Sequence, residues 1–302
     1  MSKFVEIVDV SPRDGLQSQP VVLSVEHKLE LIGRLIDAGI RRMEVASFVN
    51  PKRVPQMADA EELVRGLPQR ADVSYIGLAL NLRGFERALA CKVDEVKCAV
   101  VASDTFSTRN QGATTEQTMA LIAQITREVE AAGIGKAVTI SAAFGCPFEG
   151  EMPMERVVNL VQRLAAMGYH EISLADTIGA AGPSDVAAMI SRISSLEPEL
   201  ALGCHFHNTR NTAVANTYAA MQEGVRSFDA SCGGVGGCPF APAATGNVAT
   251  EDLLYMIHRM GFETGIDINK IIDTAKWLEG PLDAPMPAML TRAGVFPAAK
   301  AA

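Results

Sequence analysis

Two histidines placed two residues apart are the first sign of chemistry in this sequence. His205 and His207 end an apolar, β-rich segment and precede a polar loop. Alternate side chains of an extended strand share a face, so both imidazoles are expected to point the same way. Two imidazoles at a strand end supply half of a divalent metal site. The pair alone also fits two structural histidines, so a metal site requires further ligands from other strand ends.

Two oxygen donors occur at such ends. Asp14 lies in the loop after the first expected strand, and Asn247 follows a long glycine-rich loop after the last. Two oxygens and two imidazoles form a mixed hard ligand set that favours Mg²⁺ or Mn²⁺, with Zn²⁺ and Fe²⁺ as alternatives. The alternatives are a turn residue for Asp14, in Asp-Gly, and a surface salt bridge for its neighbour Arg13.

The glycine-rich loop has the composition of a lid. Four glycines occur within residues 233–237, and the prolines that follow stiffen the chain. Such a segment can carry one reactive group, here the thiol of Cys238. The alternatives are a plain turn and a phosphate-binding nest, but the chain lacks the motif context of the latter.

The elements that must position these groups recur as strand-then-helix units. Helix signals include a cap at Ser24, a terminating Gly39, a Pro55 start and a capping box at Thr114–Gln117. The expected strands cover residues 4–10, 41–47, 73–80, 95–102, 137–144, 171–175, 201–207 and 226–231. Eight such units predict an α/β fold, a closed (β/α)8 TIM barrel, with an open doubly wound sheet as the alternative.

We expect one catalytic domain over residues 1–302, with the barrel at about 4–262 and capping helices at about 263–302. Active sites of such barrels lie at the C-terminal ends of the strands. That rule adds Glu44 and Ser47 from the second strand and Asp176 and Thr177 from the sixth.

Composition narrows the function classes. The 302 residues are 48% hydrophobic and 21% charged, with a net charge of −8 and no basic run. Binding to nucleic acid or to an anionic membrane is therefore not expected. No apolar stretch is long enough to span a bilayer, and the N-terminus leads directly into a strand pattern. Six cysteines without CxxC pairs indicate reduced thiols, so a cytoplasmic location is expected and a Cys232–Cys238 disulfide is disfavoured.

Six segments carry a family resemblance. They are SPRDGLQ (11–17), EVASFVNPKRVPQM (44–57), FGCPFEG (144–150), EISLADTIG (171–179), HFHNT (205–209) and GGVGGCPFAPAATGNVATED (233–252). The sequence resembles the 3-hydroxy-3-methylglutaryl-CoA lyase family, within a wider superfamily of metal-dependent barrel lyases marked by Arg-Asp and HxH. The resemblance runs from the first strand to about residue 262. It implies cleavage of 3-hydroxy-3-methylglutaryl-CoA to acetyl-CoA and acetoacetate, a divalent cation, a role in leucine degradation and a homodimer or larger homo-oligomer.

The resemblance also implies residue roles. Arg13 would lie over the thioester carbonyl, Cys238 would be the catalytic thiol, and Glu44 and Asp176 would be active-site carboxylates. The remaining roles are metal ligation by Asp14, His205, His207 and Asn247, substrate contact by Gln17, Ser47 and Thr177, and support of the loop by Glu251. The general base stays open between Asp14, Asp176 and a histidine.

Two departures from the family pattern bear on the acyl group. Thr139 stands where these lyases often have tyrosine, and residues 208–211 read Asn-Thr-Arg-Asn rather than Asp-Thr-Tyr-Gly. Arg210 is either a cation for a carboxylate or CoA phosphate, or a solvated side chain. A citramalyl-CoA-type or longer branched 3-hydroxy-3-alkylglutaryl-CoA substrate is therefore an alternative. An acetyl-CoA-dependent condensing synthase is disfavoured by the cysteine loop. Lys52 and Arg53 are candidates for CoA phosphates.

Overall fold

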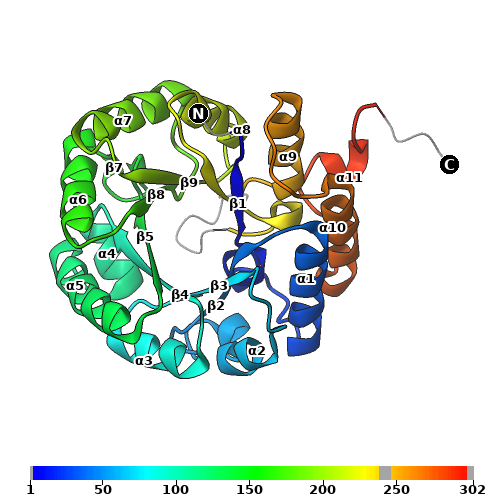
Figure 1. The fold of residues 1–302 in the computed structure, drawn as a ribbon, viewed down its shortest axis with the longest axis horizontal. Coiled ribbons are helices and arrows are strands. Elements are labelled where there is room, and N and C mark those ends of the chain that lie inside the picture. The colour runs from blue at the N-terminus through cyan, green and yellow to red at the C-terminus, as the bar shows by residue number, and fades with distance from the viewer. Residues whose placement is uncertain (1–2, 238–245, 298–302) are drawn as a thin grey trace.

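Eight parallel strands close into a barrel in the computed structural model, which describes residues 3–237 and 246–297. Around the barrel their order is β1-β10-β9-β8-β5-β4-β3-β2 (Figure 1). The strands are β1 Glu6–Asp9, β2 Arg42–Ser47, β3 Ser74–Leu78, β4 Glu95–Val101, β5 Gly135–Ser141, β8 Glu171–Asp176, β9 Ala201–Phe206 and β10 Ser227–Ala230. The predicted closed barrel is confirmed, and the open sheet is excluded.

Helices form the outer ring of the barrel in Figure 1. They are α1 Val25–Ala38, α2 Ala60–Gly66, α3 Leu82–Cys91, α5 Thr115–Ala132, α6 Met154–Ala166, α7 Pro183–Leu196, α8 Ala213–Gln222 and α9 Thr250–Arg259. The predicted C-terminal helices follow as α10, Ile268–Leu282, which contacts α1, and a short α11, Leu290–Ala293. None of the helices in the described part of the chain is long and apolar enough to cross a membrane.

Local signals explain where several helices begin and end. The Ser24 side chain accepts the backbone N–H of His27, and Gly39 ends α1 with φ of +109°. A Cβ at Gly39 would also lie 2.3 Å from the carbonyl oxygen of Gly265, so only glycine fits there. Thr114 and Gln117 exchange side-chain bonds with each other's backbone N–H, which confirms the predicted capping box.

A helix and a hairpin among the described residues were not predicted. Helix α4, Asp104–Gln111, has one large apolar residue and thus no apolar stripe, and it begins at a Ser103 cap. Two-residue strands β6, Gly145–Cys146, and β7, Gly150–Glu151, form a hairpin in the loop after β5. Pro55 begins a 3₁₀ turn, η2 Pro55–Met57, rather than α2 itself.

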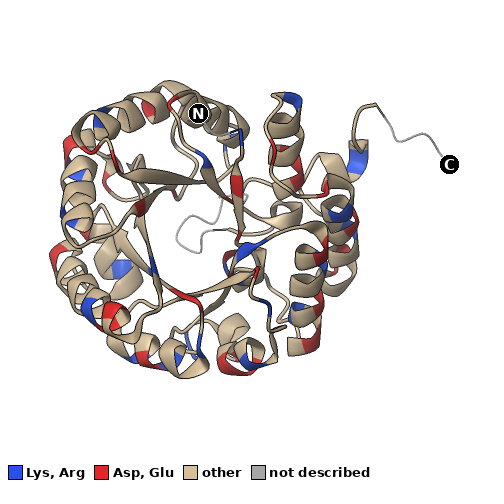
Figure 2. Ribbon diagram, viewed as in Figure 1, with Lys and Arg blue, Asp and Glu red and all other residues tan. Residues whose placement is uncertain are grey.

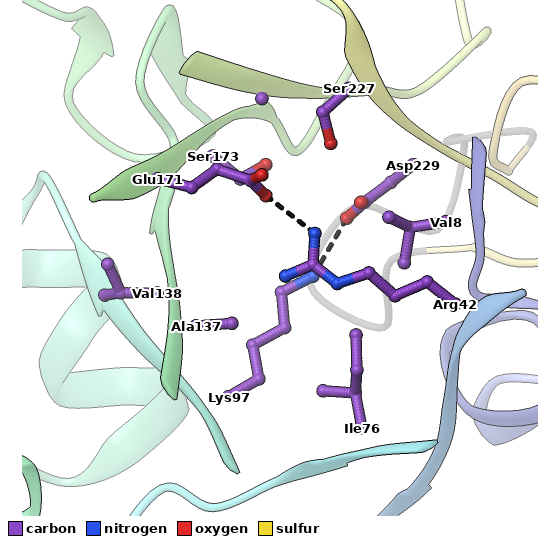
Figure 3. Close-up of a pocket in the computed structure, with 11 residues that line it drawn as sticks. Val8, Arg42, Ile76, Lys97, Ala137, Val138, Glu171, Ser173, Ser227 and Asp229 are labelled. Carbon is purple, nitrogen blue, oxygen red and sulfur yellow. Dashed lines mark hydrogen bonds and ion pairs between the residues drawn. The ribbon is translucent and has the colours of Figure 1, made fainter. Parts of the chain in front are cut away.

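An ionic cluster closes the N-terminal end of the barrel. Glu6, Arg42, Glu95 and Glu171 are the first residues of β1, β2, β4 and β8, so they meet at one end of the barrel. The Arg42 guanidinium lies 3.0 Å from Glu6, 2.8 Å from Glu95 and 3.0 Å from Glu171. Figure 3 shows the Arg42–Glu171 contact within the barrel, and Figure 2 shows that charged residues lie on the strands as well as on the outer helices. The side chains that could bind a metal lie at the opposite end.

Candidate metal centre

Three side chains from two distant segments meet at the C-terminal end of the barrel. Asp14 lies in the π-helical turn η1, Ser11–Gly15, that follows β1, while His205 lies in β9 and His207 follows directly. Their potential ligand atoms all lie within 4.8 Å of one another, and all three residues are buried. They converge because β1 and β9 both pair with β10 in the closed barrel. One carboxylate and two imidazoles are a suitable set for a divalent cation.

Asn247 joins this cluster as a potential fourth ligand. It forms an isolated β-bridge with His207, and its Nδ2 donates to Oδ2 of Asp14 at 2.9 Å. The Asn247 Oδ1 and the His207 Nδ1 are buried and have no hydrogen-bond partner. Unpaired buried polar atoms are costly, so these two atoms favour a cation as their missing partner.

The protonation states of the cluster suit metal ligation. Burial opposes ionisation of Asp14, yet the charge of Arg13 and the two histidines lower its pKa to about 2. Burial, together with His205, lowers the pKa of His207 to about 4. Asp14 is therefore ionised and His207 neutral at neutral pH, which are the forms that bind metals.

Asn247 is held in place by hydrogen bonds at the base of the glycine-rich loop. Ser231 donates its N–H to Val248 O and accepts that of Thr250 at its own carbonyl, both at 3.0 Å. Val248 also donates to Phe206 O of β9 at 3.1 Å. The two ends of the loop are thus joined to each other and to the strand of the histidines. Cys238, the predicted thiol, lies outside the described residues.

Arg13 is fixed beside the cluster by two carboxylates. Its Nε lies 2.6 Å from Oε1 of Glu44, and its Nη1 lies 2.6 Å from Oδ1 of Asp14. Burial opposes the charge of Arg13, but Glu44 and Asp14 outweigh it and raise its pKa. Gln17 donates to the same Asp14 oxygen at 3.1 Å. A permanent cation therefore stands next to the potential metal ligands.

Two buried charged residues at the site were missed by the sequence analysis. Asp229 Oδ2 lies 3.2 Å from Nδ1 of His205 and 3.0 Å from Nζ of Lys97. Burial opposes ionisation of Asp229, but Lys97 and His205 hold its pKa below the usual range. An ionised Asp229 accepts the Nδ1 proton of His205, which leaves Nε2 free to bind a metal. The sequence did contain a signal for both residues. Lys97 and Asp229 lie inside expected strands, and a charged residue is rarely buried without a partner.

The other predicted residues lie around the cluster, and among them the backbone carbonyl of Asp176 accepts the N–H of His207 at 3.3 Å. Asp176 is buried and accepts the N–H groups of Ala180 and Ala181 at 2.8 and 3.0 Å, so it shapes the loop after β8. Thr177 Oγ1 accepts the N–H of Ala142, and the buried Ser47 hydroxyl has no partner. Glu251 accepts the N–H of Gly233 at 3.0 Å, and it thus supports the start of the glycine-rich loop.

The arginine that departs from the family pattern also has a structural contact. Arg210 Nη1 donates to the carbonyl oxygens of Ile178 and Gly179, at 2.9 and 2.8 Å. The side chain therefore fastens the loop after β8 to the loop after β9.

Comparison with known proteins identifies a family and several similar lyases. Residues 4–278 match the HMGL-like family. The chain is 42% identical to the (R)-citramalyl-CoA lyase of Chloroflexus aurantiacus, over 97% of this chain and 96% of that protein. It is 40% identical to the hydroxymethylglutaryl-CoA lyase of Pseudomonas mevalonii, over 99% and 98%.

A solved structure shares the whole fold. An HMG-CoA lyase from Acinetobacter baumannii, in complex with coenzyme A and 3-methylmalate, matches with a TM-score of 0.95 and 38% identity. The match covers 100% of this chain and 99% of that one. The resemblance predicted from the sequence motifs is confirmed, and this enzyme is a member of the HMGL-like family.

Proposed function

We propose that the protein is a divalent-metal-dependent lyase that cleaves 3-hydroxy-3-methylglutaryl-CoA to acetyl-CoA and acetoacetate. The observation that carries the proposal is the buried cluster of Asp14, His205 and His207, with Arg13 beside it. Relatives named hydroxymethylglutaryl-CoA lyases, at 38 and 40% identity over nearly the whole chain, support the substrate.

Asp14, His205, His207 and Asn247 would hold the cation, with Mg²⁺ or Mn²⁺ as the best match to this ligand set. When bound, such a cation acidifies a substrate hydroxyl and acts as a Lewis acid. Asp229 orients the His205 ring, and Glu251 supports the loop that leads to Asn247.

Arg13 meets the negative charge that develops as the carbon–carbon bond breaks. In a retro-Claisen cleavage this charge collects on the thioester oxygen of the departing acetyl-CoA enolate. The guanidinium cannot lose its proton, and Glu44 and Asp14 fix its position, so it need not reorganise during the reaction. Gln17, Ser47 and Thr177 are proposed to line the substrate site.

Proton transfer requires a base for the hydroxyl and an acid for the enolate carbon. A pKa of about 2 makes Asp14 a weak base, whereas burial raises the pKa of Asp176, which makes Asp176 the stronger candidate. We assign the acid to Cys238, on the loop whose two ends are anchored beside His207. A thiol on a closing loop can protonate the enolate while water is excluded.

A second substrate, (R)-citramalyl-CoA, is favoured by one observation. Thr139 stands on β5 where the family often has tyrosine, and its hydroxyl is buried without a partner. The relative at 42% identity is named (R)-citramalyl-CoA lyase. The carboxylate of (R)-citramalyl-CoA is attached directly to the carbinol carbon. The unpaired Thr139 hydroxyl on β5 would give this carboxylate a hydrogen-bond donor.

The experiment is a metal-dependence assay with both esters. Chelator-stripped protein is incubated with each CoA ester, and acetyl-CoA is measured before and after addition of Mg²⁺ or Mn²⁺. We expect cleavage only with metal, and the ratio of kcat/KM between the esters assigns the acyl group. Absence of metal-dependent cleavage across a panel of 3-hydroxyacyl-CoA esters would refute the proposal.

The thiol assignment has its own test. Cys238→Ala should lower kcat about 10²- to 10⁴-fold, the range for loss of a general acid, and leave Mn²⁺ affinity nearly intact. Cys232→Ala is the matched control, because Cys232 is buried in the same loop and its thiol donates to Ile271 O. Equal losses in both variants would contradict the assignment.

Several finer expectations remain predictions. They are Lys52 and Arg53 as ligands of CoA phosphates, a cytoplasmic location, a homodimer or larger homo-oligomer, and a role in leucine degradation. Coenzyme A titration of a Lys52→Ala/Arg53→Ala variant tests the first, and sedimentation tests the assembly.

A further inference from the structure

A lysine is buried in the interior of the barrel below the metal cluster. Lys97 lies on β4 and is 6% exposed. Its Nζ lies 3.0 Å from Oδ2 of Asp229 on β10 and 3.2 Å from Oε2 of Glu44 on β2. Figure 3 shows the Lys97–Asp229 contact inside the barrel. One ammonium group therefore joins carboxylates from two other strands.

Each of these carboxylates also contacts a residue of the site. Glu44 uses its other oxygen, Oε1, for the Nε of Arg13 at 2.6 Å. Asp229 uses Oδ2 for the Nδ1 of His205 at 3.2 Å. The contacts run without interruption from Arg13 through Lys97 to His205, so Lys97 connects the arginine half of the site to the histidine half.

Lys97 also balances the negative charge of Glu44 and Asp229. Apart from the imidazoles, this connected network contains the cations Arg13 and Lys97 and the carboxylates Asp14, Glu44 and Asp229, for a net charge of −1. Without Lys97 the net charge would be −2 in a buried space, and Glu44 and Asp229 would lose the cation that they share. Buried charges are expensive unless paired, so both carboxylates would move or take up protons.

A second buried lysine shows what a purely structural contact looks like. Lys28 on α1 is 1% exposed and donates to Asp59 at 2.6 and 2.7 Å and to Gln56 O at 2.6 Å. Neither of these partners contacts the metal cluster. Lys97 is equally well paired, but both of its partners touch residues of the site.

We propose that Lys97 is a positioning residue: it holds Glu44 and Asp229 in place and through them orients Arg13 and His205. The kinetic part of this proposal rests on the proposed lyase function, while the structural part does not. Because Lys97 touches neither the cation ligands nor Arg13 directly in any contact described above, its effect is transmitted by the two carboxylates.

The structural test compares crystal structures of Lys97→Met and of the wild-type protein. Methionine matches the aliphatic stem of lysine and lacks the ammonium group. We expect Arg13 Nε and Glu44 Oε1 to separate, or His205 Nδ1 and Asp229 Oδ2 to do so, by more than 1 Å. Unchanged contacts at both places would overturn the proposal, whatever the enzyme turns out to cleave.

The kinetic test uses the CoA ester that the wild-type enzyme cleaves best. A misplacement of about 1 Å costs on the order of 10²-fold, so Lys97→Met should lower kcat by about that factor and change KM less than about threefold. Lys97→Arg, which keeps the charge, should recover at least about tenfold. Lys28→Met, the matched control, should keep kcat within about twofold although it loses a buried ammonium group of the same kind.

The outcomes separate the two proposals. A kcat of Lys97→Met within about twofold of wild type would overturn the positioning role, as would equal losses in Lys97→Met and Lys28→Met. If the wild-type protein cleaves none of the esters, the lyase proposal fails, and the crystal structures alone decide the role of Lys97. Should Lys97→Met not fold, Lys97→Met/Asp229→Asn keeps the net charge, and Arg13 should still be displaced through Glu44.

Discussion

Asn247 donates a hydrogen bond of 2.9 Å from its Nδ2 to Oδ2 of Asp14, although 233 positions separate the two residues. The bond connects the first loop of the barrel to the last, and it leaves Oδ1 of Asn247 buried without a partner. The two residues are neighbours only because β1 and β10 pair and close the barrel. The bond therefore fixes the two side chains relative to each other.

Asn247→Ala should weaken Mn²⁺ binding by about 10- to 100-fold, because it removes a ligand oxygen and frees Asp14 on one side. Calorimetric titration of metal-free protein measures the effect. Asn208→Ala is the control, since Asn208 follows His207 directly but among the described residues bonds only to Asn211, Ala213 and Gly246. Unchanged Mn²⁺ affinity in Asn247→Ala would remove Asn247 from the ligand set.

Asp229→Asn should also weaken Mn²⁺ binding by about 10- to 100-fold, although Asp229 is no ligand itself. An amide in place of the carboxylate holds the His205 ring less firmly and no longer selects the tautomer with a free Nε2. The same titration serves here, with Asp252→Asn as control, because Asp252 caps backbone N–H groups at residues 289 and 290. Equal affinity in both variants would contradict this role.

Glu251→Gln should change how stability depends on pH. Burial raises the pKa of Glu251 from 4.5 to about 8, so between these values the folded protein keeps a proton that the unfolded chain has released. The free energy of unfolding therefore falls as pH rises from about 4.5 to 8, by on the order of 5 kcal/mol. Glutamine does not titrate, so the variant should not lose this part of its stability. It should therefore be more stable than wild type at pH 8.5.

Urea unfolding at pH 5, 6.5 and 8.5 measures the difference. Asp9, whose pKa burial raises to about 6, should add a smaller total loss of stability, and this loss should remain in both proteins. Glu62→Gln, an exposed position on α2, should behave as wild type. Parallel pH profiles for Glu251→Gln and wild type would show that Glu251 is ionised in the folded state.

Arg42→Met should lower the free energy of unfolding by about 3 kcal/mol, because three carboxylates at the N-terminal end of the barrel lose their only cation among the described contacts. Urea unfolding gives this value, and metal affinity should stay the same. Arg192→Met, which breaks a single exposed ion pair with Glu155, should cost less than about 1 kcal/mol. Equal effects of the two substitutions would mean that the cluster adds no more than one surface pair.

Features that depend on residues close together in the chain could be predicted from the sequence. Strand periodicity placed His205 and His207 on one face, and the rule that barrel sites lie at strand ends brought Asp14 and Asn247 to them. The cap at Ser24 and the capping box at Thr114 are likewise local, and both are present.

What the sequence did not reveal depends on which strands are neighbours and in what register. His205 and Asp229 face each other because β9 pairs with β10 at that position. Lys97 reaches Glu44 and Asp229 only across the interior of a closed barrel. Helix α4 was missed because its sequence lacks an apolar stripe, so its burial depends on tertiary contacts.

The hydrogen bonds from Ser231 to Val248 and from Thr250 to Ser231 hold the two ends of the long last loop together. Both of its ends are fastened at one point on the barrel, and closure of a loop depends only weakly on its length. The strand ends therefore set the position of Asn247 beside His207. The cation site that we propose takes its geometry from the barrel itself.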